Sequence, residues 1–192
     1  MKICIVCFDD FTDIDVFLPW DLLNRVRLVG NVTDWEVRLV GTKSVHTSVA
    51  GLTIPMSGTM EEIKESDAVI FASGPGVQRL ICDSDYLNEL KLNLDKQLIG
   101  SMCSGALILG ALGLLTGKRA TTYPTVMKQL SNYDVQVVEE RFVNIGNIST
   151  AAGCLAAQDL VSWVIESLVG EEVVNQVLES VQPVGEAVIQ KL

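Results

Sequence analysis

Cys103 is the residue of this sequence best placed for nucleophilic chemistry. It lies within residues 97–106, where a short apolar run meets Cys-Ser-Gly, and a helix-like apolar run follows at 107–115. This order predicts a nucleophile elbow, a sharp strand-to-helix turn, with cysteine in the serine position. The turn sets the sulfur near a helix N-terminus, where the helix dipole favours the nucleophilic thiolate. Alternatively, Cys103 is a small buried apolar residue at the end of a core strand.

The elements that must position Cys103 alternate between strand-like and helix-like patterns. We expect strands at 2–8, 35–40, 68–72 and 97–102, a β-hairpin from 47–49 and 52–55, and short strands at 135–138, 142–144 and 147–150. Helices are expected at 15–28, 60–65 and 107–115, from the corner at 151–153 to about 169, and at 171–180, with a tail from Pro183. This alternation predicts a mostly parallel sheet covered on both faces. The expected fold class is α/β, a three-layer α/β/α sandwich of flavodoxin-like type, in a single domain of residues 1–192.

Three of the expected strand ends carry residues suited to a site. They are the acidic loop 9–14, the Ser-Gly-Pro-Gly turn 73–76, and Cys103 itself. Ligands of open parallel sheets bind beyond the carboxyl ends of the strands, so we expect the site there.

Composition restricts the partners of the chain. Its 192 residues carry a formal net charge of -10 without a block of basic residues, which argues against nucleic acid or an anionic membrane as partner. We expect a cytoplasmic protein, because the N-terminal apolar run is too short for a signal peptide and no apolar segment is long enough to cross a bilayer. The five cysteines are odd in number and scattered, as is typical of reduced thiols.

Metal and redox motifs are weak in this sequence. Cys4 and Cys7 form a C-x-x-C pair, but inside a strand the two side chains fall on opposite faces. His46 is the single histidine, so a His-rich metal site is excluded, and we expect His46 to be an exposed, structural residue of the hairpin. Neither a metal nor a cofactor is expected.

Several motifs, taken in order along the chain, resemble the ThiJ/PfpI superfamily, which has the class I glutamine amidotransferase-like fold. The matching segments are 15–19, 73–76, 102–106, 114–122 and 141–153. The strings at 117–122 and 146–153 are most similar to the branch with isonitrile hydratase and the amidotransferase-like domains of AraC-type regulators. The DNA-binding region of those regulators is not expected here, since the sequence ends at Leu192.

The resemblance implies roles for particular residues. Asp15 matches the acidic residue that lies beside the cysteine, as a proton shuttle; the alternative is that it caps the first helix. A carboxyl group so close to a thiolate is expected to be protonated or to share a proton. Backbone N–H groups of Gly74 and Ser104 would form an oxyanion pocket. Ser73 replaces the usual glycine and is expected to narrow that pocket.

The chain lacks histidine at two positions where members of the family carry it. Relatives carry histidine after the nucleophile or after Ala-Thr-Thr, where this chain has Ser104 and Tyr123. A Cys-His peptidase mechanism therefore has no obvious base. Tyr123 is a candidate to orient a ligand through its hydroxyl; alternatively its ring simply packs.

The expected function is a cysteine-dependent enzyme, a homodimer that acts on a small molecule. In the hydratase-like hypothesis the Cys103 thiolate adds to an electrophilic carbon such as that of an isonitrile, Asp15 delivers a proton, and water resolves the adduct. The alternatives are a glyoxalase or deglycase-type enzyme, an intracellular protease or amidase-like member, and a non-catalytic redox or ligand sensor.

Overall fold

A seven-stranded sheet organises the computed structural model, which describes residues 1–183. Its strand order is β10-β11-β7-β6-β1-β2-β5, and every neighbouring pair is parallel except β10 with β11. The strands are β1 (Lys2–Val6), β2 (Glu36–Gly41), β5 (Gly58–Thr59), β6 (Ala68–Phe71), β7 (Leu98–Met102), β10 (Phe142–Ile145) and β11 (Ile148–Ala151). All four residues of β6 are buried, as expected for a parallel strand covered on both faces. The α/β class is confirmed.

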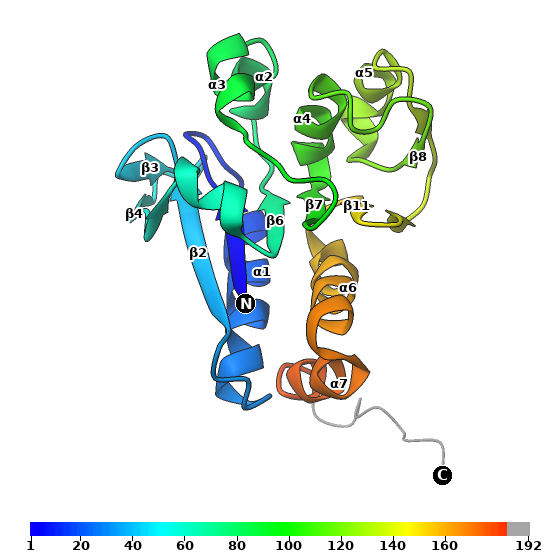
Figure 1. Ribbon diagram of the computed structural model, residues 1–192. Coiled ribbons are helices and arrows are strands. Elements are labelled where there is room, and N and C mark those ends of the chain that lie inside the picture. Colours follow the sequence, from blue (N-terminus) through cyan, green and yellow to red (C-terminus); the bar gives the residue numbers. More distant parts are fainter. Residues whose placement is uncertain (184–192) are drawn as a thin grey trace.

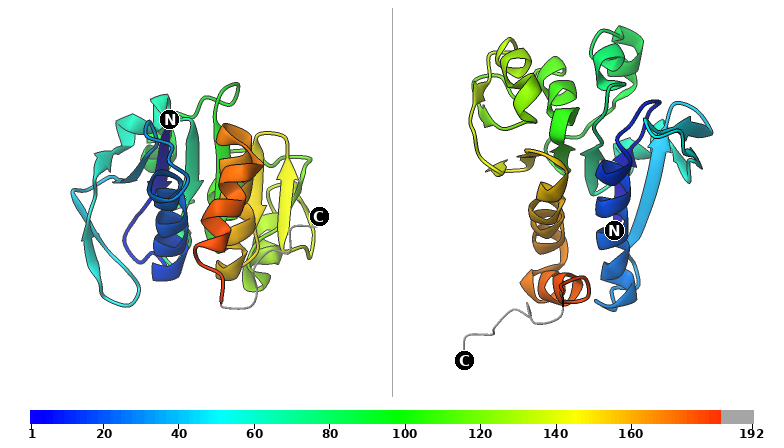
Figure 2. Two further views of the ribbon diagram at one scale, coloured as in Figure 1. Left: turned by 90° about the horizontal axis from the view of Figure 1, so that it is seen from below. Right: turned by 180° about the vertical axis from the view of Figure 1, so that it is seen from behind.

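Three helices lie together, and two of them cover one face of the sheet while the last along the chain packs against both. They are α1 (Asp13–Leu28), α6 (Ala157–Val169) and α7 (Glu171–Glu179), and α1 and α6 lie side by side (Figure 2). In α6 the buried residues recur at helical spacing, at Leu160, Val161, Val164 and Ile165. Leu160 packs directly on Gly100 of β7, where a Cβ would lie 2.8 Å from its Cδ1. This face therefore holds β7 closely against α6.

Short helices gather toward the end of the sheet to which the parallel strands point (Figure 1). They are α2 (Val77–Leu80), α3 (Ser84–Glu89), α4 (Ala106–Ala111) and α5 (Met127–Ser131), with single turns η2 (Cys103–Gly105), η3 (Pro124–Val126) and η4 (Cys154–Ala156). The pair β8 (Arg119–Ala120) and β9 (Gln136–Val137) joins them. Two of these turns, η2 and η4, begin with a cysteine.

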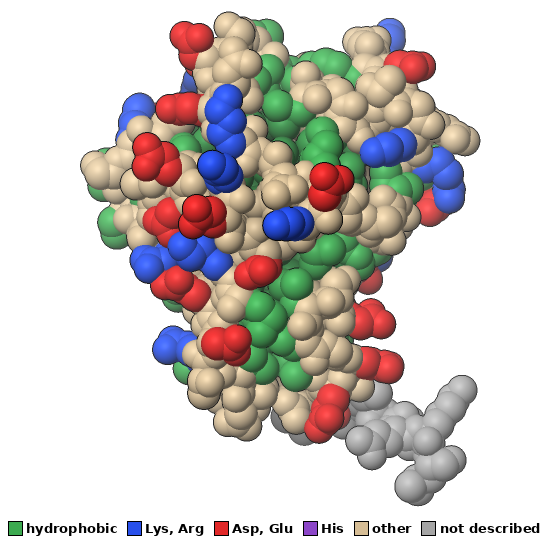
Figure 3. All heavy atoms as spheres, in the orientation of Figure 1, with side chains coloured by type: hydrophobic (Ala, Val, Ile, Leu, Met, Phe, Trp, Pro, Cys, Tyr) green, Lys and Arg blue, Asp and Glu red, His purple; other side chains and the backbone are tan. Residues whose placement is uncertain are grey.

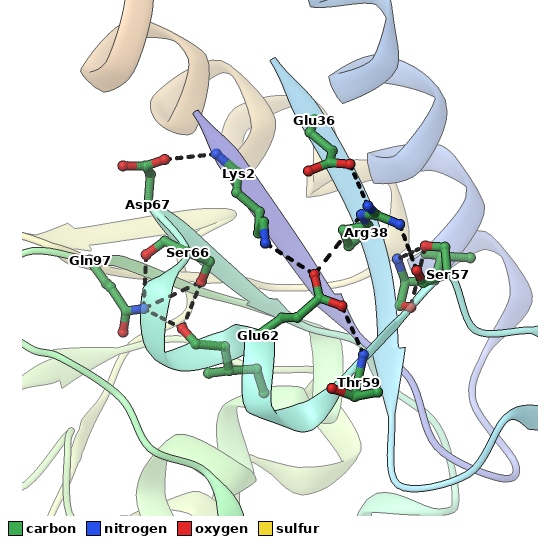
Figure 4. Close-up of polar contacts among 11 residues, drawn as sticks. Lys2, Glu36, Arg38, Ser57, Thr59, Glu62, Ser66, Asp67 and Gln97 are labelled. Carbon is green, nitrogen blue, oxygen red and sulfur yellow. Dashed lines mark hydrogen bonds and ion pairs between the residues drawn. The ribbon is translucent and has the colours of Figure 1, made fainter. Parts of the chain in front are cut away.

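A polar network fixes η1 (Met60–Glu65) over β1 and β2 (Figure 4). The Glu62 carboxylate accepts from the Thr59 backbone N–H at 3.1 Å and from Lys2 Nζ at 3.1 Å. The buried Gln97 amide donates to the Ser66 carbonyl at 2.8 Å. Charged side chains of both signs are interspersed on this face, with apolar patches between them (Figure 3). The network therefore holds η1, which links β5 to β6, against the sheet.

The hairpin of β3 (Val45–Thr47) and β4 (Thr53–Pro55) corrects one expectation. His46 is buried, with 2% of its surface exposed, rather than exposed. Its Nδ1 lies 3.0 Å from Asp9 Oδ1, and its ring packs on Gly41, whose missing side chain makes room. Lys43 also donates to Asp9, and this hydrogen bond holds the pKa of Asp9 well below its usual range. His46 is therefore part of a structural cluster that ties the hairpin to the loop after β1.

Other boundaries differ by a few residues from the sequence expectations. The first helix begins at Asp13 instead of Asp15, and the helix after Cys103 ends at Ala111 instead of Leu115. The expected tail falls, after Pro183, outside the described residues. Within residues 1–183, no helix combines the length and the apolar character needed to cross a bilayer.

Candidate active site

Cys103 occupies the sharp turn that the sequence predicts. It directly follows β7 and has φ 49°, in the left-handed region that a non-glycine residue rarely adopts. Such a conformation costs on the order of 1–3 kcal/mol and persists where the surroundings enforce it. Gly105 allows the turn to close, because a Cβ there would lie 2.5 Å from the Ala72 carbonyl oxygen. The thiol is 8% exposed at the resulting elbow.

Asp15 lies in the first turn of α1 with none of its surface exposed. Its Oδ2 accepts a hydrogen bond from the Ser73 hydroxyl. Its Oδ1 is buried and accepts no regular hydrogen bond from any residue of 1–183. The N-cap position belongs to Thr12, so the alternative of Asp15 as a helix cap is wrong. The carboxyl group instead points into the interior of the site.

The carboxyl group and the thiol perturb each other. Burial raises the pKa of Asp15, and the hydroxyl of Ser73 and the thiols of Cys154 and Cys103 partly offset this by hydrogen bonding. Burial, followed by the negative charge of Asp15, raises the pKa of Cys103 to about 11. Both shifts favour the neutral forms of the two acids, so a negative charge on one of them opposes a charge on the other.

Burial and the negative charge of Asp15 oppose the thiolate that a helix dipole would favour, because both raise the pKa of Cys103. The helix after the elbow, α4, has only six residues and begins after the turn η2, so its dipole is small. The adjacent carboxylate and the burial outweigh it. Protonation of Asp15 would remove one of the two causes that oppose a thiolate at Cys103.

Gly74 and Ser104 lie together, but the backbone donor of Gly74 is occupied. The Gly74 N–H donates to the Ser104 hydroxyl oxygen at 3.2 Å. Gly74 has φ 140°, and a Cβ there would lie 2.2 Å from the Asp10 carbonyl oxygen. The Ser104 backbone N–H interacts with the Cys103 sulfur and lowers the pKa of that thiol. Because a hydroxyl that accepts from Gly74 keeps its own proton, Ser104 presents an O–H donor where a second backbone N–H donor was expected.

Sequence reasoning missed the part that Ser73 plays. Ser73 was expected only to narrow the pocket, whereas its buried hydroxyl donates to Asp15 and also lowers the pKa of Cys103. The residue lies just past β6, and β6 neighbours β7 in the sheet. A serine in place of a family glycine beside the nucleophile was the available signal.

Cys154 is the second residue that the sequence reasoning missed. It begins η4, three residues after β11 ends at Ala151. Its thiol lies close enough to the Asp15 carboxyl group to interact with it, and burial together with this interaction raises the pKa of Cys154 to about 12. The available signal was the position of Cys154 just after an expected strand. That strand, β11, pairs with β7, and Ala151 lies opposite Met102. Its chain therefore emerges beside Cys103.

Thr122, rather than Tyr123, contacts the elbow. The buried Thr122 hydroxyl donates to the Cys103 carbonyl oxygen at 2.8 Å, whereas 44% of Tyr123 is exposed. A ligand-orienting role for Tyr123 stays a prediction. Thr122 also lines a hollow of about 350 Å³, the rest of which is formed by Pro124, Met127, Glu139, Glu140, Arg141 and Ala152. This hollow borders the site and has room for a small substituent.

Similarity to known proteins shows the family to which this fold belongs. The chain matches the DJ-1/PfpI family over residues 1–167 and belongs to that family. It is 31% identical over 172 residues to an isonitrile hydratase of Pseudomonas putida, an alignment that covers 88% of this chain and 73% of the relative. It is 27% identical over 175 residues to a deglycase of Pyrococcus abyssi, with 86% and 96% covered.

A solved structure supports the same fold. Schizosaccharomyces pombe DJ-1 superposes with a TM-score of 0.81 at 19% sequence identity, covering 95% of this chain and 100% of that one. Similarity at this level of identity establishes the architecture. The chemistry must be argued from the site.

Proposed function

We propose that this protein is a cysteine-dependent enzyme that hydrates a small electrophile of the isonitrile class. The observation that carries the proposal is the placement of Cys103, at a left-handed elbow, against a fully buried carboxyl group whose charge raises the pKa of the thiol. The isonitrile hydratase relative supplies the substrate class. The Cys103 thiol would be the nucleophile and Asp15 the proton shuttle.

The reaction would begin when Cys103 gives its proton to Asp15. The thiolate then adds to the isonitrile carbon, forming a C–S bond, and Asp15 returns the proton to the same carbon. The product of this step is a thioimidate. The Ser104 hydroxyl, polarised by the Gly74 N–H, would donate to the lone pair of the thioimidate nitrogen and stabilise the charge that develops there when water adds.

Water would complete the cycle. The Asp15 carboxylate accepts a proton from a water molecule as the water oxygen adds to the thioimidate carbon, and Asp15 passes that proton to the substrate nitrogen. The C–S bond then breaks, the proton of the new hydroxyl group returns to the sulfur through Asp15, and an N-substituted formamide leaves. The sum is one isonitrile and one water to one formamide, with Cys103 and Asp15 restored.

The second candidate is glyoxalase or deglycase chemistry on 2-oxoaldehydes. The same thiolate and carboxyl group would add to a carbonyl and move a proton, and the Pyrococcus relative favours this reading. The protease or amidase-like alternative is less favoured. Its base would be histidine, and His46, the single histidine of the sequence, is buried against Asp9.

The proposal extends to assembly and location. We expect a cytoplasmic homodimer whose interface includes the exposed apolar side chains Ile14, Val49 and Leu52. These belong to neighbouring segments, because the Val49 N–H donates to the Phe11 carbonyl just before α1. Apolar side chains grouped in this way are typical of an interface between copies.

Turnover of two substrates tests the function. The purified protein is incubated with cyclohexyl isonitrile or with methylglyoxal, and the products are followed by NMR. We expect formamide from the isonitrile, and loss of turnover by about 100-fold or more in Cys103→Ala and in Asp15→Asn. Cys82→Ala, at an exposed thiol, is the matched control that keeps activity. Turnover of methylglyoxal alone would select the second candidate, and undiminished turnover in Cys103→Ala would refute both.

A further inference from the structure

Two thiols, not one, border the buried carboxyl group of Asp15. Cys103 follows β7 and Cys154 follows β11, and these strands are parallel neighbours with Met102 opposite Ala151. Adjacent strands lie about 4.8 Å apart, so the chain leaves both strand ends within reach of one point. The hydratase mechanism uses Cys103 and leaves Cys154 without a part.

The surroundings of Cys154 allow its thiol to approach Cys103. Ala152 and Gly153 precede it, and Gly153 has φ 92°, a left-handed bend that starts the turn η4. The residue is half-buried, so a change of its rotamer is not locked by a packed core. The thiol and Cys103 therefore enclose the carboxyl group from two sides.

The unpaired oxygen of Asp15 can accept a proton from a neighbouring thiol. Oδ2 is bonded to Ser73, whereas Oδ1 is fully buried and has no regular partner within residues 1–183. A buried carboxylate oxygen without a donor is unfavourable, and it is a ready acceptor for a proton. It can take a proton from either thiol in turn.

We propose that Cys103 and Cys154 form a reversible disulfide, with Cys154 resolving a Cys103 that a hydroperoxide has oxidised. The Cys103 thiolate attacks the distal peroxide oxygen, the O–O bond breaks, and the alkoxide or hydroxide that leaves takes the proton held by Asp15. The sulfur, now a sulfenic acid, has lost two electrons to the peroxide.

The second step forms the disulfide. Cys154 gives its proton to Asp15 and its thiolate attacks the sulfenic sulfur, forming the S–S bond. The hydroxide that leaves takes the proton from Asp15 and departs as water. An external dithiol then reduces the disulfide and restores both thiols, so the nucleophile is protected from irreversible oxidation to sulfinic acid. This inference is independent of the proposed hydration.

Peptide mapping tests the disulfide. The full chain carrying Cys82→Ser, which removes the exposed thiol, is treated with equimolar hydrogen peroxide, blocked with N-ethylmaleimide and digested with trypsin without reduction. Lys118 and Arg141 separate the two cysteines into different peptides. We expect a linked pair of peptides that has lost two hydrogen atoms, which dithiothreitol reverses.

The matched variant adds Cys154→Ser, whose hydroxyl still donates to Asp15. Here the linked pair should vanish, Cys103 should be trapped by dimedone as sulfenic acid, and excess peroxide should convert it to sulfinic acid several-fold faster than in the Cys82→Ser parent. The inference is overturned if the parent forms no linked pair and its Cys103 reaches sulfinic acid as fast as in the variant. Because the linked pair is sought in the parent, a variant that fails to fold does not affect that result.

Discussion

Asp15 raises the pKa of both thiols that lie beside it, adding to the effect of burial. Its carboxyl group contacts a hydroxyl on one oxygen and lies beside two thiols, all in an environment from which water is largely excluded. Burial favours the neutral form of each of these acids, and a charge on any one of them disfavours a charge on the next. The reactivity of Cys103 therefore depends on where one proton resides.

Asp15→Asn should make Cys103 easier to ionise while it removes the shuttle. The charge of Asp15 is the second cause, after burial, of a thiol pKa near 11, so its removal should lower that pKa by about 1 unit or more. The measurement is the rate of iodoacetamide alkylation against pH, in a Cys82→Ser background so that the exposed thiol does not contribute. An unchanged or higher midpoint in Asp15→Asn would show that the carboxyl group and the thiol are not coupled.

The order of the strands brings these residues together. Because β7 lies between β6 and β11, Cys103 at its end is flanked by Ser73 on one side and Cys154 on the other, while α1 brings Asp15 over them. Each contributes from a separate segment of the chain. No local sequence window contains the site, and the sheet assembles it.

Two glycines of the β7 segment should respond differently to alanine. At Gly105 a Cβ would meet the backbone carbonyl of Ala72 at 2.5 Å, whereas at Gly100 it would meet the end of the Leu160 side chain at 2.8 Å. A side chain can turn aside and a strand carbonyl cannot, so Gly105→Ala should cost about 1–3 kcal/mol more in unfolding free energy than Gly100→Ala. Urea denaturation measures both, and an equal cost would show that the elbow tolerates a Cβ.

For the whole molecule, the sequence was sufficient to predict the architecture because buried parallel strands are nearly continuous apolar runs. Six of the seven strands of the main sheet were placed within one or two residues, the short edge strand β5 was missed, and the elbow followed from the small residues around Cys103. The missed features depend on partners far along the chain. His46 is buried because its ring nitrogen hydrogen bonds with Asp9, which lies 37 positions away in the sequence. The Ser73 hydroxyl likewise donates to Asp15, which lies 58 positions away.

Stability against pH should also report on the buried carboxyl group. Burial raises the pKa of Asp15 above the unfolded value of about 3.9, so the native state prefers the protonated form. The stability associated with that proton is fully present below the unfolded pKa and is lost as pH rises through the folded pKa. The free energy of unfolding of Asp15→Asn relative to wild type should therefore increase from pH 4 to pH 8 in urea titrations. A constant difference would mean that Asp15 titrates normally.

The edge strand β5 bears on how the protein behaves at high concentration. An exposed strand is a template on which another chain can add by backbone pairing, the route to fibrils and precipitation. Here β5 is only two residues long and pairs with Val40 and Gly41, so residues 36–38 of β2 form the rest of this edge. Glu36 and Arg38 form an ion pair on that uncovered part, and charged side chains on an edge disfavour the addition of another strand. We therefore expect this side of the molecule to resist self-aggregation even though the interior is rich in β-forming sequence.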